Sequence, residues 1–418
     1  MMLRIWIVLT LISMWAPLTV ANQLHDVFTP ISPSAFPQVI RHSFYSKSLQ
    51  ENRVIDVSLP VNYVETADDI NYPVILVMDG ELLFYSVSGL VEIMSMTSQM
   101  PEAIVIGINN TPGDRRNMMP RTLNEEGQLH RYGGKEKEYL AFIKDEVLPM
   151  IDKTYRAASF RTMIGLSPSA KLTLHTFWQA PELFDAHVAI NTGDFKAQGY
   201  QEESVFDKIE QLVAKSPEFK GKLYLSMGPY NLAAKLKEQE RLQKKFFSFP
   251  SSRMNFKTEI IDKSGYATAL PSIISALEMI FPAEKWDVSY RKFFSEQPAQ
   301  TLKSVKLHFD ALSKEYGFTV LPKGERFYNR TRLKRLGYQL LEDGRSAEAI
   351  AMFTYWQEFY PYAANSHDSL ADAYEANNQL EMALKSRIKA VQIAKRNKDA
   401  RLAIFEFALQ DLKRRMGS

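Results

Sequence analysis

The chain has 418 residues, of which 45% are apolar and 24% charged, a balance that suits two or three globular units and excludes a disordered or fibrous protein. The formal net charge is only +3 with both signs interspersed, so no nucleic-acid surface or polybasic membrane patch is indicated. The chain contains no cysteine, which excludes disulfides and thiolate sites and makes folding independent of the redox compartment.

Residues 1–21 have the pattern of a secretory signal. They carry one charge, Arg4, followed by an apolar run from Ile5 to Trp15 and the small-residue end Thr19-Val20-Ala21. The alternative is an uncleaved membrane anchor, but the run is short for the roughly 20 residues that a spanning helix needs. We therefore expect cleavage after Ala21, a periplasmic or secreted mature chain, and no stable membrane insertion afterwards.

The next part of the chain alternates strands with helices. Residues 42–49 and 53–59 alternate apolar and polar side chains, as two half-buried antiparallel strands do, and the short apolar runs 74–78 and 103–108 are typical of buried parallel strands. The remaining expected elements are strands at 161–165, 187–191, 222–227 and 257–261, and helices at 133–155, 171–178, 205–214, 232–247 and 271–281. This order predicts an α/β fold, a doubly wound and mostly parallel sheet.

The C-terminal part is expected to be helical. Residues 283–328 are amphipathic and aromatic and suit a helical connector. From Arg332 a 34-residue repeat appears, in which Leu336, Gly337, Leu340 and Ala349 recur as Leu370, Ala371, Tyr374 and Ala383. It resembles tetratricopeptide repeats, although the second copy has Arg387 where an aromatic residue is usual. The expected organisation is a signal peptide (1–21), an α/β-hydrolase domain (22–282), a connector (283–328) and a repeat-like helical domain (329–418).

Residues 164–170 read Ile-Gly-Leu-Ser-Pro-Ser-Ala, a variant of the nucleophile elbow G-x-S-x-G. That motif places a serine on a sharp strand-to-helix turn, where the N–H of the following residue helps to bind the oxyanion. Ser167 keeps the place of the nucleophile. Pro168 has no N–H to donate, and Ser169 replaces the second glycine.

The elbow and several neighbouring motifs resemble the putative-esterase family of α/β-hydrolases, which includes the ferric-enterochelin esterases. The matching stretches are 77–84, 107–111 with 115–120, 142–149, 161–170 and 181–191, and the resemblance covers roughly residues 40–282. It implies an α/β-hydrolase fold, a serine ester hydrolase activity and a small ester or siderophore-like ligand. The other residues that it places around Ser167 are Gly80, Glu81, Asn110, Arg115, Arg116 and Tyr230.

The same resemblance assigns the two triad partners of the serine to altered positions. The acid position falls on Asn231, which can hydrogen-bond a histidine but cannot stabilise an imidazolium charge. The histidine position falls on Ser264 or Gly265, so no imidazole is present in that segment. The triad is therefore expected to be degenerate at both partners of Ser167.

A base from elsewhere in the chain is the alternative. His187 and His130 are the nearest candidates, but a strand histidine is more often a core residue and a loop histidine is usually solvated. Lys171 stands one helical turn after Ser167 and allows a serine-lysine pair, although a helix-surface lysine is the commoner reading. No spacing in the sequence indicates a metal or nucleotide site, so no cofactor is expected.

Three functions are compatible with these observations. The favoured one is a catalytically impaired binding or scaffold module with the hydrolase fold. The second is an active carboxylesterase or thioesterase that uses Ser167 with a relocated base. The third is a protein-interaction module that acts through the helical tail, where Tyr355, Trp356, Tyr360 and Tyr362 form an aromatic cluster; docking of the tail on the α/β domain is the favoured role of these rings, because two repeats are too few to stand alone.

Overall fold

The computed structural model describes residues 39–111, 115–120, 133–191, 205–215, 220–229, 232–248, 254–324 and 332–417. The expected signal peptide, His130, Tyr230 and Asn231 lie outside these described residues.

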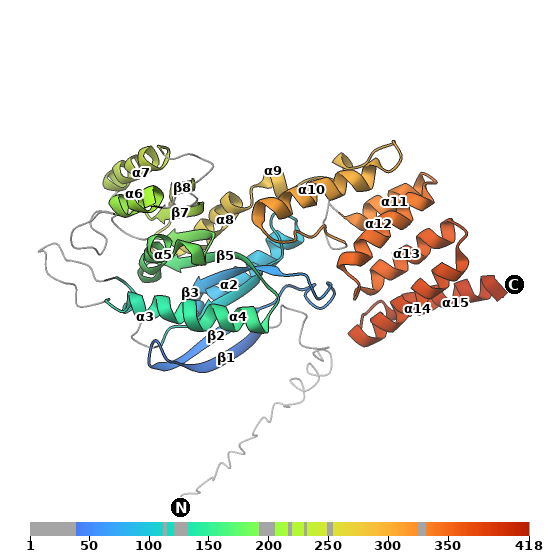
Figure 1. The fold of residues 1–418 in the computed structure, drawn as a ribbon, viewed down its shortest axis with the longest axis horizontal. Coiled ribbons are helices and arrows are strands. Elements are labelled where there is room, and N and C mark those ends of the chain that lie inside the picture. The colour runs from blue at the N-terminus through green and yellow to red at the C-terminus, as the bar shows by residue number, and fades with distance from the viewer. Residues whose placement is uncertain are drawn as a thin grey trace, which may run out of the picture. The chain divides into compact units, whose positions relative to one another are not determined.

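An eight-stranded sheet forms the centre of the α/β part, in the order β1-β2-β4-β3-β5-β6-β7-β8 (Figure 1). The first two strands are antiparallel to their neighbours and the rest are parallel, as the sequence patterns predict. The bounds are β1 (Val39–Ser46), β2 (Glu51–Ser58), β3 (Tyr72–Met78), β4 (Ile104–Ile108), β5 (Ala157–Leu166), β6 (Ala186–Ile190), β7 (Gly221–Met227) and β8 (Met254–Ile260). The predicted α/β class with a mostly parallel sheet is confirmed.

Helices cover both faces of this sheet. One face packs against α2 (Gly80–Met96) and α8 (Ala269–Ile280). The other face packs against α5 (Pro168–Gln179) and a long segment made of α3 (Glu136–Ala141), a π-helix (Phe142–Val147) and α4 (Leu148–Thr154). Near β7 and β8, α6 (Val205–Lys215) and α7 (Leu232–Phe246) complete the layer.

Two of these helical regions differ from the sequence-based expectations. Helix α2 was not predicted: Leu83, Phe84 and Val87 are buried at helical spacing, but the exposed Leu82 and Tyr85 blur the contrast between its two faces. The single helix expected at 133–155 contains a π-helical stretch that ends just before Pro149. Proline has no N–H to donate, and its ring crowds the carbonyl one turn earlier. Both effects explain the wider turn.

The C-terminal part is entirely helical over the residues described there. After α9 (Ala283–Trp286) and α10 (Gln300–Tyr316), consecutive helices pack as antiparallel pairs (Figure 1). Gly337 permits the first close approach, because a Cβ at this position would lie 2.2 Å from Cε1 of Phe353. The helices are α11 (Leu333–Glu342), α12 (Ser346–Phe359), α13 (Ala364–Ala376), α14 (Leu380–Asn397) and α15 (Leu402–Gly417).

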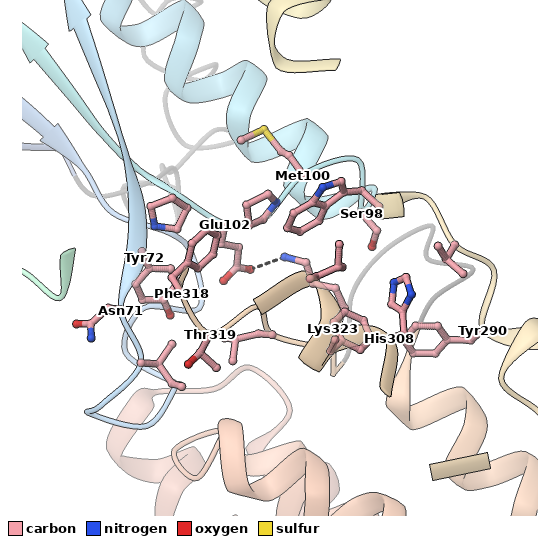
Figure 2. A pocket seen from close by; sticks show the side chains of 18 of the residues that line it. Asn71, Tyr72, Ser98, Met100, Glu102, Tyr290, His308, Phe318, Thr319 and Lys323 are labelled. Carbon is pink, nitrogen blue, oxygen red and sulfur yellow. Dashed lines mark ion pairs between the residues drawn. The ribbon is translucent and has the colours of Figure 1, made fainter. Parts of the chain in front are cut away.

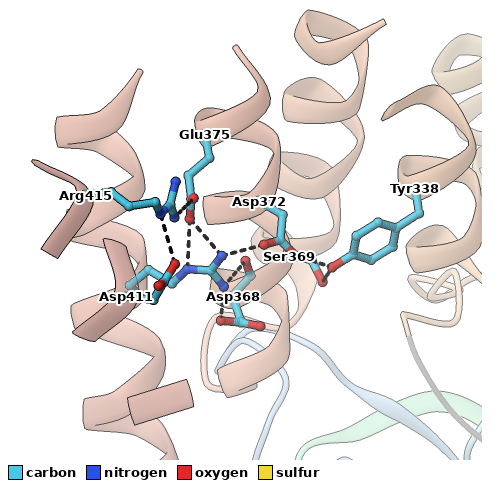
Figure 3. A network of polar contacts seen from close by, with 8 residues as sticks. Tyr338, Asp368, Ser369, Asp372, Glu375, Asp411 and Arg415 are labelled. Carbon is cyan, nitrogen blue, oxygen red and sulfur yellow. Dashed lines mark hydrogen bonds and ion pairs between the residues drawn. The ribbon is translucent and has the colours of Figure 1, made fainter. Parts of the chain in front are cut away.

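Arg387, the departure from the repeat pattern, is buried in an ionic network between α13, α14 and α15 (Figure 3). Its guanidinium pairs with Asp368, with Asp372 at 2.5 Å and with Glu375 at 2.8 Å. Arg415 of α15 pairs with the same Glu375. Ion pairs therefore replace the aromatic packing that usually joins these helices.

The helical tail is hydrogen-bonded to the loop before β3. The N–H of Ala67 donates to the carbonyl of Phe359 at 3.0 Å, and the N–H of Tyr362 donates to the carbonyl of Glu65 at 3.1 Å. Tyr355, Trp356 and Tyr360 are buried in one cluster with connector residues such as Tyr290 and Phe293. These contacts favour the docking role of the aromatic cluster.

Candidate active site

The elbow serine has the strained backbone that its position demands. Ser167 lies between β5 and α5 with φ 59° and ψ −107°, a region that costs a non-glycine residue about 1–3 kcal/mol. Its N–H is held by the carbonyl of Ile190 at 2.8 Å. A Cβ at Gly165 would lie 2.5 Å from the carbonyl oxygen of Ser169, so the first glycine of the motif is required for the turn. The sequence thus folds into a complete nucleophile elbow with a half-buried serine.

The two altered elbow positions have different consequences. Pro168 is the first residue of α5, where its fixed φ suits the helix start, but it has no N–H to bind an oxyanion. Ser169 is fully buried; its Oγ accepts the N–H of Leu166 at 2.7 Å and donates to Oδ2 of Asp79 at 2.7 Å. The residue that replaces the second glycine therefore ties the elbow to the loop after β3.

Asp79 is the centre of a polar cluster below Ser167. This carboxylate is fully buried. It accepts hydrogen bonds from Nε of Arg115 at 2.8 Å and from NH2 of Arg115 at 3.1 Å. The same arginine donates to the carbonyl of Leu166 at 3.0 Å and to the hydroxyl of Tyr266. Burial opposes the charge of Arg115, but the hydrogen bonds and charge of Asp79 raise the pKa of the guanidinium above its ordinary value. Arg115 is thus a brace between three segments of the site.

The loops after β3 and β4 are joined in the same region. The side-chain amide of Asn110 donates to Oδ1 of Asp79 at 2.7 Å and to Oε1 of Glu81 at 2.9 Å. Gly80 has no room for a side chain, because a Cβ there would lie 2.5 Å from Oδ1 of Asn109. Four of the predicted pocket residues therefore come together at the carboxyl ends of the strands, namely Gly80, Glu81, Asn110 and Arg115. Arg116 is exposed.

The segment on which the family's histidine position falls contains no histidine. Ser264 is exposed and precedes a 3₁₀ turn that spans Gly265–Thr268. Gly265 has φ 56°, a left-handed conformation that suits glycine. The side chain that reaches the cluster from this segment is Tyr266, whose ring centroid lies 4.9 Å from the guanidinium of Arg115.

His187 is a core residue. It pairs in register with Met163 of β5, four residues before Ser167, which places it about 13 Å back along the strand. Its ring lies edge-on to Phe177 and Phe184, at centroid distances of 5.1 Å and 5.8 Å. Neither ring nitrogen has a hydrogen-bond partner among the described residues, and complete burial lowers the pKa of His187 to about 3.

The other described histidines are also remote from Ser167. His175 lies two turns along α5, about 12 Å from Ser167 along the helix axis, and burial lowers its pKa to about 4. His42 bonds the hydroxyl of Tyr155 at 2.6 Å, and His308 and His367 belong to α10 and α13. Within the described parts of the chain, no imidazole is therefore placed to deprotonate Ser167; His25 and His130 lie outside them.

Lys171 is the remaining candidate base. It follows Ser167 by one turn of α5, and helical side chains lean toward the preceding turn. The side chain makes no ion pair with a described residue, and burial lowers the pKa of its ammonium. Lys171 is therefore better suited to a proton transfer than a solvated surface lysine.

Sequence reasoning located the elbow and its loops but missed two of the contacts that hold them. The bond between Arg115 and Tyr266 joins residues 151 positions apart, and no local pattern marks it. The hydrogen bond from Ser169 to Asp79 had a weak signal in the sequence. A serine stands at a glycine position of the motif, and a buried hydroxyl needs a hydrogen-bond partner.

The described helices include none that is long and apolar enough to cross a membrane. Among the described residues, no group of three or more histidine, aspartate or glutamate side chains is arranged to hold a metal ion.

A mostly parallel sheet with a strained serine between a buried strand and a helix defines the α/β-hydrolase fold. Residues 46–196 match the family model described as "Putative esterase", which confirms the family resemblance over the elbow and its preceding loops. This part of the chain is therefore similar to that esterase family.

Two solved structures show the same fold. An IroE-like serine hydrolase from Shewanella oneidensis is 19% identical, covers 75% of this chain and 95% of its own, and has a TM-score of 0.56. An uncharacterised protein from Capnocytophaga ochracea is 18% identical, covers 90% of this chain and 99% of its own, and has a TM-score of 0.54. The second match extends into the helical tail. A search of curated proteins finds no match.

Proposed function

We propose that this protein is an exported, esterase-like ligand-binding module whose hydrolytic chemistry is impaired. The observation that carries the proposal is the segment before α8, where Tyr266 is bound to Arg115 and the segment itself carries no histidine. A serine without a base is a protonated alcohol and a poor nucleophile at neutral pH. Loss of the base typically leaves only the roughly 10³–10⁴-fold rate enhancement that binding and an oxyanion hole supply.

Pro168 weakens this residual mechanism as well. Removal of one oxyanion donor costs about 2.7–4 kcal/mol of transition-state stabilisation, and a proline at this position has no N–H. The polar groups nearest to the elbow are also committed to one another, since Asp79 binds Arg115, Asn110 and Ser169. These contacts suit a site that holds its shape without performing acid-base chemistry.

The ligand class follows from the family resemblance and from the loops that surround the serine. We propose a small ester or siderophore-like ligand above Ser167, contacted by Gly80, Glu81 and Asn110. Binding is testable by calorimetric titration with a tricatecholate siderophore. Asn110→Ala should weaken it, and Lys314→Ala on the exposed side of α10 serves as the matched control.

Catalysis is tested with the purified protein, short p-nitrophenyl esters and a fluorophosphonate probe. We expect neither labelling nor turnover above that of the Ser167→Ala variant. Rapid turnover that disappears in Ser167→Ala would contradict the impaired reading and establish a working esterase.

An active carboxylesterase or thioesterase is the second candidate, and Lys171 is the observation that favours it. In that case the burial that lowers the pKa of Lys171 favours its neutral amine, which can take the proton of Ser167. Lys171→Met should then abolish turnover, and the rate should rise with pH as the ammonium is deprotonated. If Lys171→Met retains the activity that Ser167→Ala loses, another base is responsible.

A protein-interaction role for the tail is the third candidate. The hydrogen bonds of Phe359 and Tyr362 to the loop before β3 support a structural role for the aromatic cluster rather than an open partner surface. A pull-down with immobilised protein tests this role. A partner whose binding is kept when the elbow is mutated but lost when the tail is mutated would support an interaction module.

A further inference from the structure

A second pocket lies at the end of the sheet opposite to Ser167. It is formed by the start of β3 and the loop before β4 on one side, and by α10 and its flanking segments on the other (Figure 2). Because β3 and β5 run parallel, Tyr72 lies at the amino end of the strands and Ser167 lies beyond their carboxyl end. The aromatic walls of the pocket are Tyr72, Trp286, Tyr290, Phe293, Phe309 and Phe318.

A buried ion pair provides the polar side of this pocket. Nζ of Lys323 lies 3.1 Å from Oε1 of Glu102, and the two side chains are only 15% and 10% exposed. The side-chain amide of Asn62 donates to the same Oε1 at 2.7 Å. The second carboxylate oxygen, Oε2, is buried and has no hydrogen-bond partner among the described residues. A buried acceptor without a partner is costly, so this oxygen requires a donor that the described side chains do not supply.

The charges around the pocket favour a neutral ligand. Lys323 and Glu102 balance each other, so neither an ammonium nor a carboxylate group would find an unpaired counter-charge. The half-buried ring of His308 lies 5.2 Å from the ring of Phe293 and 5.1 Å from that of Phe309, and burial lowers the pKa of this imidazole, which disfavours its charged form. Aromatic walls favour a flat ring through stacked and edge-to-face contacts.

The size of the pocket sets the scale of its ligand. The cavity has a volume of about 40 Å³, and because one water needs about 10–15 Å³, only a small molecule fits it. The exposed side chains of Asn71 and Thr319 mark an open side, from which a ring can enter with its polar group first (Figure 2).

We propose that this pocket binds a small neutral phenol, with the ring between the aromatic walls and the hydroxyl at the Glu102–Lys323 pair. A hydroxyl is both a donor and an acceptor. It can therefore donate to the unpartnered Oε2 of Glu102 and accept from Nζ of Lys323, which has three N–H groups and a single ion pair among the described residues.

The experiment is a titration of the purified full chain with phenol, followed by ligand-observed NMR and by the fluorescence of Trp286. We expect saturable binding at millimolar concentration, and binding of toluene, benzoate and benzylamine at least about tenfold weaker. Thr319→Trp at the open side should weaken phenol binding by at least about tenfold. Lys314→Trp, which adds the same side chain at an exposed position of α10 outside the pocket, should leave binding unchanged.

Three results would overturn the proposal: no saturation with phenol, equal binding of phenol and toluene, or full binding by Thr319→Trp. A crystal soaked with phenol that shows only ordered waters at Oε2 of Glu102 would also overturn it. Glu102→Gln should reduce the preference for phenol over toluene. If that variant fails to fold, the ligand series and the Thr319→Trp comparison still decide.

Discussion

At the scale of single residues, the shape of the elbow depends on a buried carboxylate. Asp79 itself has φ 57° and is fully buried, where an unpaired carboxylate is strongly unfavourable. The guanidinium of Arg115 and the hydroxyl of Ser169 supply its partners. This carboxylate therefore has a structural role, because it holds the elbow and the loop of Arg115 together.

Replacement of this carboxylate should therefore destabilise the protein. Asp79→Asn leaves Arg115 without its counter-charge, and we expect the free energy of unfolding to fall by about 2–4 kcal/mol. The control is Asp152→Asn, which breaks the more exposed pair with Arg161 and should cost about 1 kcal/mol or less. Urea unfolding of both variants measures the difference, and equal losses would show that the Asp79 cluster is not a structural brace.

His187 makes a second prediction at this scale, on pH dependence. Its pKa falls from about 6.5 in the unfolded chain to about 3 in the folded one, so the folded state excludes the proton. The stability that this neutral ring contributes is complete above pH 6.5 and is lost as the pH falls toward 3. Relative to the wild type, His187→Leu should therefore gain about 2–3 kcal/mol of stability between pH 7 and pH 4.5.

Urea unfolding at the two pH values tests this linkage. Phe177→Leu, a change at a neighbouring ring without a titratable group, is the control, and its effect should not depend on pH. If the His187→Leu difference is equally independent of pH, the imidazole is accessible to protons in the folded state.

At the scale of elements, the second helical repeat shows how a break in a pattern is compensated. Arg387 is buried against three carboxylates of α13, namely Asp368, Asp372 and Glu375, which are spaced at four and three residues and so share one helix face. The charge of the arginine holds these like charges together. Local sequence marks the departure at Arg387, but the acidic face that receives it belongs to another helix.

Removal of this arginine should cost more than removal of an apolar side chain of similar size. Arg387→Leu leaves half-buried carboxylates facing one another, and we expect a loss of about 3–5 kcal/mol in the free energy of unfolding. A triple change of Asp368→Asn, Asp372→Asn and Glu375→Gln in the Arg387→Leu background should recover most of that loss. Urea unfolding measures both, and no recovery would mean that the packing of the arginine stem matters more than its charge.

The extent to which the sequence predicted the structure also depends on the type of element. Buried parallel strands such as β3 and β4 are short apolar runs, and the elbow is a local motif, so both could be predicted. Helix α2 was missed because the exposed Tyr85 and Ile93 lie on its outer face. The link from Arg115 to Tyr266 joins loops that only the folded sheet brings together, and therefore no periodicity reveals it.

At the scale of the whole molecule, the core of the α/β part continues into the connector. Phe160 of β5 lies 5.5 Å from the ring of Tyr316 and 5.9 Å from that of Phe318. Phe281 stacks on Tyr316 at 5.5 Å and meets Trp286 at 5.3 Å. These rings belong to one hydrophobic cluster together with α2 and α8, so the connector completes the core rather than only linking two domains.

A fragment that ends at residue 282 should therefore be unstable. It keeps Phe160 and Phe281 but loses Trp286, Tyr316 and Phe318, and the loss of burial and ring contacts amounts to about 5 kcal/mol. For a domain of this size we expect the melting temperature to fall by about 10–20 °C, or the fragment to aggregate. Hydrogen exchange should show lost protection in β5, where Phe160 lies.

The control fragment ends at residue 398 and lacks only α15, whose buried side chains contact α13 and α14, so its β5 protection should match that of the full chain. A soluble, monomeric fragment 22–282 with an unchanged melting temperature would show that the esterase-like part folds without the connector, and the tail would then be free to act as a separate binding module.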